Sequence, residues 1–252
     1  MILAYLSECD SEAIDNYYLD NASILLSGST GWGIEEGFDS HADWDIHIIL
    51  DESSYQRYLL QYGPNHVVDD HLHNPIVFAQ IRSKDWLVSR LKAENTSLLY
   101  LWIYANGTWI KDGLNISTMI QKFQQNFEQD LQKYARESFV KFSVRRLDAS
   151  SSAKRGLLLA SNIYCGEMIE SALRAYCVSQ GSPYPYNKWL AKQVEMLGGF
   201  PLLNLCENVI QASSVDNFVH QCKRLRNSLE NTMREKFDNQ RWIDYWWEYN
   251  EN

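Results

Sequence analysis

The hydrophobic pattern changes near residue 115, and this change constrains the fold more than any other feature of the sequence. Before it, short β-rich runs alternate with helical segments. After it, apolar residues recur only at helical spacing. A chain that separates its strands from most of its helices in this way favours an α+β class, a mixed sheet flanked by helices and then an all-α bundle. We therefore expect two domains, residues 1–115 and 116–252, each long enough to bury a core.

In the front half, alternating or β-rich composition marks the expected strands, and apolar residues at helical spacing mark the expected helices. The expected strands are residues 22–26, 43–50, 75–81, 98–104 and 108–110, the last two joined by a turn at Asn106-Gly107. The expected helices are residues 10–20, 51–63 and 83–91.

The back half predicts helices throughout. They cover residues 116–145 as one or two helices, then 153–180, 188–197, 202–212 and 215–237. Ser214 is the expected N-cap of the last of these, because a serine hydroxyl accepts a hydrogen bond from an amide of the first helical turn.

Charge and composition narrow the function classes. The net charge of −9 disfavours long nucleic acid as a partner, since the basic stretches 141–146 and 223–226 are short. A small polyanion remains compatible, because a metal ion masks its charge. Five widely spaced cysteines indicate reduced thiols, and no run approaches the ~18 apolar residues of a membrane span. We expect a cytoplasmic protein without membrane contact, either monomer or homodimer.

Residues 26–50 (LSGSTGWGIEEGFDSHADWDIHIIL) contain the residues best suited to chemistry. Gly28-Ser29 ends a strand, where glycine lets a ligand approach the backbone and the following amides can turn toward an anion. Asp43 and Asp45 lie two apart on a predicted strand and so share a face. Two carboxylates that close repel each other unless a cation joins them, and hard oxygen ligands suit Mg²⁺.

This pattern resembles the motif of the nucleotidyltransferase superfamily, whose members are DNA polymerase beta-like. That motif has Gly-Ser after an apolar residue, about nine to thirteen residues, and then Asp–apolar–acidic–apolar. Here residues 30–42 separate Gly28-Ser29 from Asp43-Trp44-Asp45-Ile46. The helical half, with Pro-Tyr-Asn-Lys-Trp-Leu at 185–190, resembles bacterial aminoglycoside adenylyltransferases and their uncharacterised relatives.

The resemblance implies a role for each matching residue. Gly28 and Ser29 would bind the triphosphate of a nucleotide, and Asp43 and Asp45 would ligate one or two Mg²⁺ ions. An acceptor hydroxyl on a small molecule would attack the α-phosphorus of ATP or another nucleoside triphosphate, and pyrophosphate would leave. Arg174 and Lys188 are the candidates by which the helical domain would contact the nucleotide.

One departure from the family pattern affects catalysis. The family places a third carboxylate on a later strand, but the expected strand 75–81 carries only Gln80 as a polar side chain. Asp69, Asp70 and Asp85 flank this strand and are possible substitutes. Without a third acid, the protein would be a nucleotide-binding or interaction protein with little or no turnover.

Three other readings stay open. A protein-AMPylating partner in a toxin–antitoxin pair is a further alternative, although such subunits are shorter and lack a helical half. His66, His71 and His73, together with Asp69 and Asp70, are most simply a solvated loop rather than a zinc site. His47 is either a partner of the aspartates or a packed core histidine.

Overall fold

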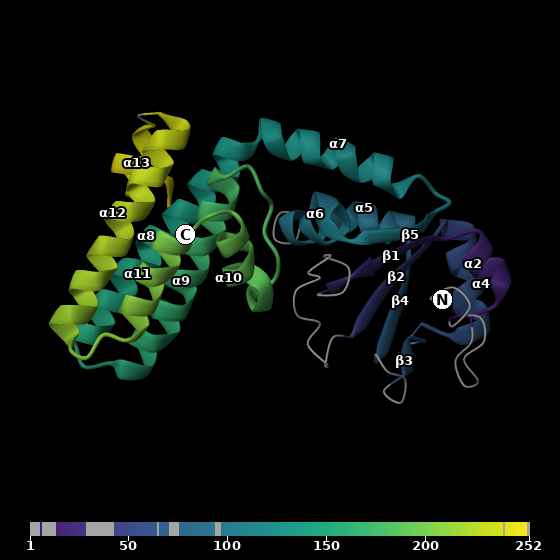
Figure 1. Ribbon diagram of the computed structural model, residues 1–252, viewed down its shortest axis with the longest axis horizontal. Coiled ribbons are helices and arrows are strands. Elements are labelled where there is room, and N and C mark those ends of the chain that lie inside the picture. Colours follow the sequence, from purple (N-terminus) through teal and green to yellow (C-terminus); the bar gives the residue numbers. More distant parts are fainter. Residues whose placement is uncertain are drawn as a thin grey trace. The chain divides into compact units, whose positions relative to one another are not determined.

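The computed structural model describes residues 6, 14–28, 43–64, 66–70, 76–93, 97–238 and 240–250. The chain divides into two compact units, residues 1–125 and 126–252, which we call the sheet unit and the helical unit (Figure 1). The division falls inside helix α7 (Ile116–Gln129), which begins where the sequence places the domain boundary.

A mixed β-sheet forms the centre of the sheet unit. Among the described residues the strand order is β3-β4-β2-β1-β5. Strands β2 and β4 run parallel, whereas β1–β2, β1–β5 and β3–β4 are antiparallel pairs. The strands are β1 (Ser23–Ser27), β2 (Trp44–Leu50), β3 (Val68–Asp70), β4 (Val77–Ser83) and β5 (Thr108–Asp112). With helices on both faces and a helical region after it, this sheet confirms the expected α+β class.

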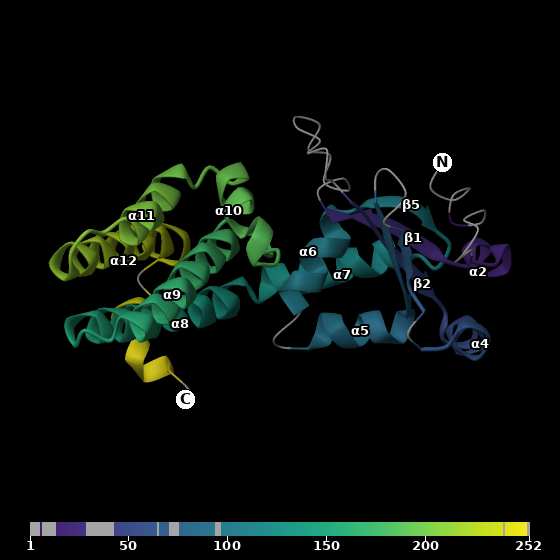
Figure 2. The same cartoon turned by 90° about the horizontal axis from the view of Figure 1, so that it is seen from below.

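The two faces of the sheet pack against different helices (Figure 2). Ile46 and Ile48 of β2 form a continuous apolar core with Tyr18 of α2 (Asn16–Asp20) and Tyr58 of α4 (Glu52–Tyr62). On the opposite face, α5 (Lys84–Lys92) packs along β4 and α6 (Ser97–Asn106) along β1. Because side chains alternate along a strand, the other residues of β2 point toward α5 and α6.

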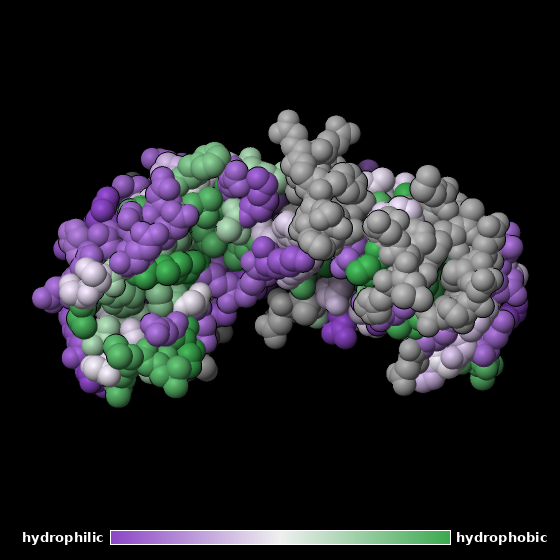
Figure 3. Space-filling model, turned by 60° about the horizontal axis from the view of Figure 1, so that its bottom comes forward, coloured by the Kyte–Doolittle hydropathy of each residue, from purple (hydrophilic) through white to green (hydrophobic). Residues whose placement is uncertain are grey.

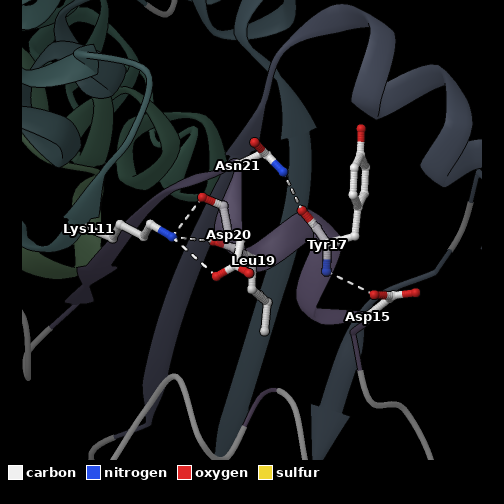
Figure 4. A network of polar contacts seen from close by, with 6 residues as sticks. All are labelled: Asp15, Tyr17, Leu19, Asp20, Asn21 and Lys111. Carbon is white, nitrogen blue, oxygen red and sulfur yellow. Dashed lines mark hydrogen bonds and ion pairs between the residues drawn. The ribbon is translucent and has the colours of Figure 1, made fainter.

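The last two residues of strand β5, Lys111 and Asp112, contact the end of helix α2 and the start of helix α7. Lys111 Nζ donates to the main-chain oxygens of Leu19 at 3.0 Å and Asp20 at 2.7 Å, which end helix α2 (Figure 4). A cation at a helix C-terminus satisfies carbonyls that have no partner within the helix. Asp15 accepts from the amide of Tyr17 at the other end, so this five-residue helix is capped at both termini.

Asp112, the last residue of β5, fixes the start of helix α7. One carboxylate oxygen accepts from the Ile116 amide at 2.7 Å and from Ser23 Oγ at 2.8 Å, and the other accepts from Ser117. Burial alone would raise the pKa of Asp112, but these hydrogen bonds outweigh it and hold the pKa below its ordinary value. The carboxylate therefore joins β1, β5 and α7 at one point.

The expected strand at residues 98–104 was wrong, because this segment lies in helix α6. A short apolar run has no period that separates a strand from a buried helix. In the structure, the side chains of this run that are buried, among them Leu98, Leu101 and Trp102, follow helical spacing. No hairpin turn forms at Gly107, whose amide instead donates to Ile103 O at 3.0 Å. The expected strand at 108–110 is confirmed as β5.

Two further differences from expectation concern segment ends. The polar stretch that was assigned to a loop contains strand β3 at its centre, paired with β4. The helix expected at 153–180 begins instead at Leu158, because α8 continues to Lys154 and Gly156 adopts a φ of +73° between them. A residue with positive φ cannot continue a right-handed helix, and glycine accepts this conformation without steric cost.

The helical unit contains long amphipathic helices. Ser161 Oγ of α9 donates to Ala149 O of α8 at 3.1 Å, in the most extensive helix pair of the unit. Ser214 caps α12 by accepting from the Asn217 amide at 3.2 Å, as expected. The helices are α8 (Leu131–Lys154), α9 (Leu158–Ser179), α10 (Asn187–Met196), α11 (Phe200–Ile210), α12 (Val215–Phe237) and α13 (Arg241–Asp244), followed by the 3₁₀ turn η1 (Trp246–Tyr249).

The helical unit exposes apolar side chains, visible as green areas over its helices in Figure 3. Leu158 and Leu159 at the start of α9 and Ile210 at the end of α11 are among the exposed ones. In the part of the chain that the structure describes, no helix combines the length and the apolar character that crossing a membrane requires.

Asp51 provides a test of the capping of α4. It accepts from the Ser54 amide at 3.0 Å and from Ser53 Oγ at 2.6 Å. The hydrogen bond from Ser53, followed by those from Ser54, lowers the pKa of Asp51 from 3.8 to about 2. We expect Asp51→Ala to lower the free energy of unfolding by about 1 kcal/mol at neutral pH, the usual worth of an N-cap. Urea unfolding followed by circular dichroism measures this.

The pH dependence follows from the sign of the shift. A lowered carboxylate pKa stabilises the folded state above the unfolded value near 4, and this stabilisation is lost as pH falls toward 2. The gap between wild type and Asp51→Ala should therefore narrow between pH 4 and pH 2. Asp51→Asn keeps a capping oxygen and serves as the matched control, and a gap that widened in acid would contradict the assignment.

Candidate functional site

The end of β1 and the beginning of β2, two neighbouring strands inside the sheet, form a tight corner. Ser27 pairs with Asp45 across the antiparallel strands, and Gly28 follows with a φ of +70°. A Cβ placed on Gly28 would collide with Oδ2 of Asp45, so the carboxylate lies directly against the glycine backbone. Both the conformation and the space at this position therefore require glycine.

Asp43 directly precedes β2 and is exposed to solvent. The main-chain amide of the next residue, Trp44, donates to Ile76 O at 2.7 Å, which fixes the entry of β2 beside β4. Ser29 lies outside the described residues. The roles expected for Gly28, Ser29, Asp43 and Asp45 in nucleotide and metal binding stay predictions, but Gly28 and Asp45 do lie side by side.

A chain of polar contacts runs from helix α6 to the backbone of Asp45. The hydroxyl of Tyr104 lies 3.4 Å from Nδ1 of His47, and Nε2 of His47 lies 3.0 Å from Ser27 Oγ. Ser27 Oγ in turn donates to the main-chain oxygen of Asp45 at 3.3 Å. His47 therefore lies between the helix layer and the corner, as a hydrogen-bonded group rather than an apolar packing residue.

His47 is held in the neutral form. Burial, together with the positive charge of Arg82, lowers the pKa of His47 to about 4. Burial raises the pKa of Tyr104 above its ordinary value, so its hydroxyl keeps its proton. The chain behind Asp45 therefore contains uncharged groups near neutral pH, and its hydrogen bonds do not change with protonation there.

Strand β4 has no acid where the family's third carboxylate would be expected. In the parallel register Phe78 lies opposite Asp45, and Gln80 lies opposite His47. The observed strand is shifted two residues toward the C-terminus of the expected range, and the shift does not introduce an acid.

Of the three flanking candidates, Asp69 shares the row of Asp45. It pairs with Phe78 from the next strand, so its Cα lies two strand spacings, about 10 Å, from that of Asp45. Asp70 pairs with Val77, and Asp85 follows the opposite end of β4. Within the described ranges, no three His, Cys, Asp or Glu side chains gather closely enough to hold a metal ion. His71 and His73 lie outside those ranges.

Arg174 and Lys188 belong to the helical unit, and both make local contacts there. Arg174 forms an ion pair with Glu170 at 2.5 Å, and its guanidinium group lies 4.8 Å from the ring centroid of Tyr184. Lys188 Nζ lies 5.1 Å from the ring centroid of Trp189. These contacts account for both cations structurally, and their proposed contact with nucleotide stays a prediction.

Sequence reasoning offered His47 either as a partner of the aspartates or as a packed core histidine, but it did not find Ser27 between His47 and Asp45. The alternation of β2 places His47 on the same face as Asp45, which is the available signal for a link between them. The partner Ser27 belongs to another strand, and only the cross-strand register brings it to His47.

Neither a protein-family model nor a curated protein matches this chain. Among solved structures it is similar to a nucleotidyltransferase-like protein from Exiguobacterium sibiricum, with 13% identity and a TM-score of 0.44. That alignment covers 88% of this chain and 74% of the other. A similarity this weak does not establish a function, and the function proposed below rests on the corner formed by Gly28 and Asp45.

Replacing Gly28 tests the geometry of the corner. Gly28→Ala forces a side chain into a left-handed conformation and against Asp45, so we expect a loss of clearly more than the ~1 kcal/mol that the conformation alone costs. Gly63→Ala is the matched control, since Gly63 has a φ of +86° with open space around it. Urea midpoints measure both variants, and equal losses would show that Asp45 does not lie against Gly28.

Proposed function

We propose that this protein is a Mg²⁺-dependent nucleotidyltransferase that moves a nucleoside monophosphate, AMP from ATP, onto a hydroxyl group of a small molecule. The observation that supports it is the position of the Asp45 carboxylate against a positive-φ glycine at the end of β1. This is an arrangement in which a hard acidic ligand lies beside backbone that a triphosphate can approach closely.

In this proposal each group of the corner has a defined task. Asp45, together with Asp43 two residues before it, would hold one or two Mg²⁺ ions. Bound there, the metal would neutralise phosphate charge and lower the pKa of the attacking hydroxyl. Gly28 and Ser29 would place their amides toward the phosphates. The acceptor hydroxyl would then attack the α-phosphorus in line, and pyrophosphate would leave.

The acceptor class follows from charge and from the family resemblance. A chain of net charge −9 favours a cationic acceptor over an anionic one, and an aminoglycoside-like compound, as in antibiotic resistance enzymes, has both positive charge and hydroxyl groups. Arg174 and Lys188 would contact the nucleotide from the helical unit. A fold alone does not fix a substrate, so the acceptor is proposed only as a class, a small molecule with hydroxyl groups.

A second function is favoured by one observation on the same sheet. The row of Asp45 carries Phe78 on the neighbouring parallel strand, so the position suited to a third metal ligand or general base is apolar. A protein with this arrangement would bind nucleotide and metal without rapid turnover. Asp69, one strand farther along the row, is the described carboxylate that would rescue catalysis in the enzyme reading.

Pyrophosphate release from ATP tests the enzyme proposal. The assay uses Mg²⁺ or Mn²⁺ and a panel of hydroxyl-bearing acceptors. We expect turnover by wild type and a loss of roughly 10²–10³-fold in Asp45→Asn, the scale for removing one preorganised electrostatic group. Asp85→Asn, at the far end of β4, is the control that should keep wild-type activity.

The remaining outcomes separate the two functions. Equal inactivity of wild type and Asp45→Asn, combined with Asp45-dependent binding of ATP and Mn²⁺, would favour the binding protein. Loss of turnover in Asp69→Asn with nucleotide affinity unchanged would identify Asp69 as the missing acid. If neither protein binds ATP or Mn²⁺, both functions are excluded.

A further inference from the structure

The hydroxyl of Ser27 is the central member of the chain behind the candidate site. A main-chain oxygen only accepts, so the contact at 3.3 Å uses the single hydroxyl hydrogen of Ser27 to reach Asp45 O. Ser27 Oγ must then accept from its other neighbour, Nε2 of His47, at 3.0 Å. This assigns the hydrogen of His47 to Nε2 and leaves Nδ1 as an acceptor.

The remaining contact agrees with this direction. Tyr104, which is fully buried, has a hydroxyl that can donate to Nδ1 of His47. Tyr104, His47 and Ser27 thus each donate once to the next member, and the chain ends at the main-chain oxygen of Asp45, which only accepts. Reversing the direction of one hydrogen bond would leave another member of the chain without a partner. A buried polar group without a partner is costly, so this direction is favoured.

The end of the chain controls a peptide plane at the corner. The oxygen that accepts from Ser27 belongs to the peptide bond after Asp45, and its orientation sets the backbone from which the carboxylate projects. The same serine immediately precedes Gly28, whose backbone touches that carboxylate. One side chain therefore ties together both residues of the corner.

We propose that His47 is a positioning residue that, through Ser27, holds the Asp45 carboxylate in place at the corner. The inference rests on the proposed function, because it concerns the geometry of the same site. It assigns to His47 a requirement for a hydrogen-bond donor at the Nε2 position. A histidine that only fills space against the ring of Tyr104, 5.4 Å between centroids, would have no such requirement.

The test is Mn²⁺ affinity of the full chain, measured by electron paramagnetic resonance of free Mn²⁺ with a non-hydrolysable ATP analogue present. We expect His47→Leu and Ser27→Ala each to weaken Mn²⁺ binding by about 10- to 100-fold, the usual effect of removing a group that orients a metal ligand. His47→Gln places an amide donor near the Nε2 position and should retain most of the affinity. The double variant should be little worse than either single one, since both break one chain.

A second tyrosine–histidine pair in the same unit provides the matched control. The hydroxyl of Tyr58 contacts Nδ1 of His66, and Tyr58 belongs to the core on the opposite face of the sheet. His66→Leu should lower stability and leave Mn²⁺ affinity unchanged. Thermal melting shows which variants are folded, and Ser27→Ala and His47→Gln keep the test decisive if His47→Leu does not fold.

The outcomes distinguish the proposed function from the positioning role of His47. Equal Mn²⁺ binding by wild type and Asp45→Asn would overturn the proposed function, and the positioning role with it. Binding that Asp45→Asn abolishes but folded His47→Leu and Ser27→Ala retain in full would overturn only the positioning role. Equal losses in His47→Leu and His47→Gln would also overturn it, because the donor at Nε2 would then be irrelevant.

Discussion

The antiparallel register of β1 and β2 is the constraint on which the rest of the candidate site depends. It sets Ser27 opposite Asp45, and so decides that Gly28 turns against a carboxylate. A slip of one residue would exchange the two faces of β2 and send Asp45 toward the apolar core. Ile46 and Ile48, almost fully buried on that face, make such a slip costly.

The two faces of the sheet therefore differ in character. Its α2/α4 face is continuous and apolar and fixes the pairing of the strands. The opposite face can then accommodate polar side chains on β1 and β2, where hydrogen bonds link Ser27 to His47 and His47 to Tyr104 of α6. A metal-binding function needs both properties, because a carboxylate is useful as a ligand only where rigid structure fixes its direction.

Local sequence patterns predicted the elements that have a capping residue or a clear alternation. Helix α4 has its cap at Asp51, α12 has its cap at Ser214, and β2 alternates clearly. Helix α6 was missed because its continuous apolar run fits a strand as well as a helix. Strand β3 was missed because its three residues, two of them Asp, become a strand only through pairing with β4. The link from Ser27 to His47 joins residues of different strands, so it depends on register, which composition does not encode.

The carboxylate of Asp112 has a consequence for any attempt to dissect the chain. It is bonded on one side to Ser23 of the central sheet and on the other to the first turn of α7. A fragment ending at residue 115 would retain the carboxylate and its hydrogen bond from Ser23, and would lose those from Ile116 and Ser117. A fragment that keeps all of these hydrogen bonds therefore ends beyond Ser117, inside the helix that follows.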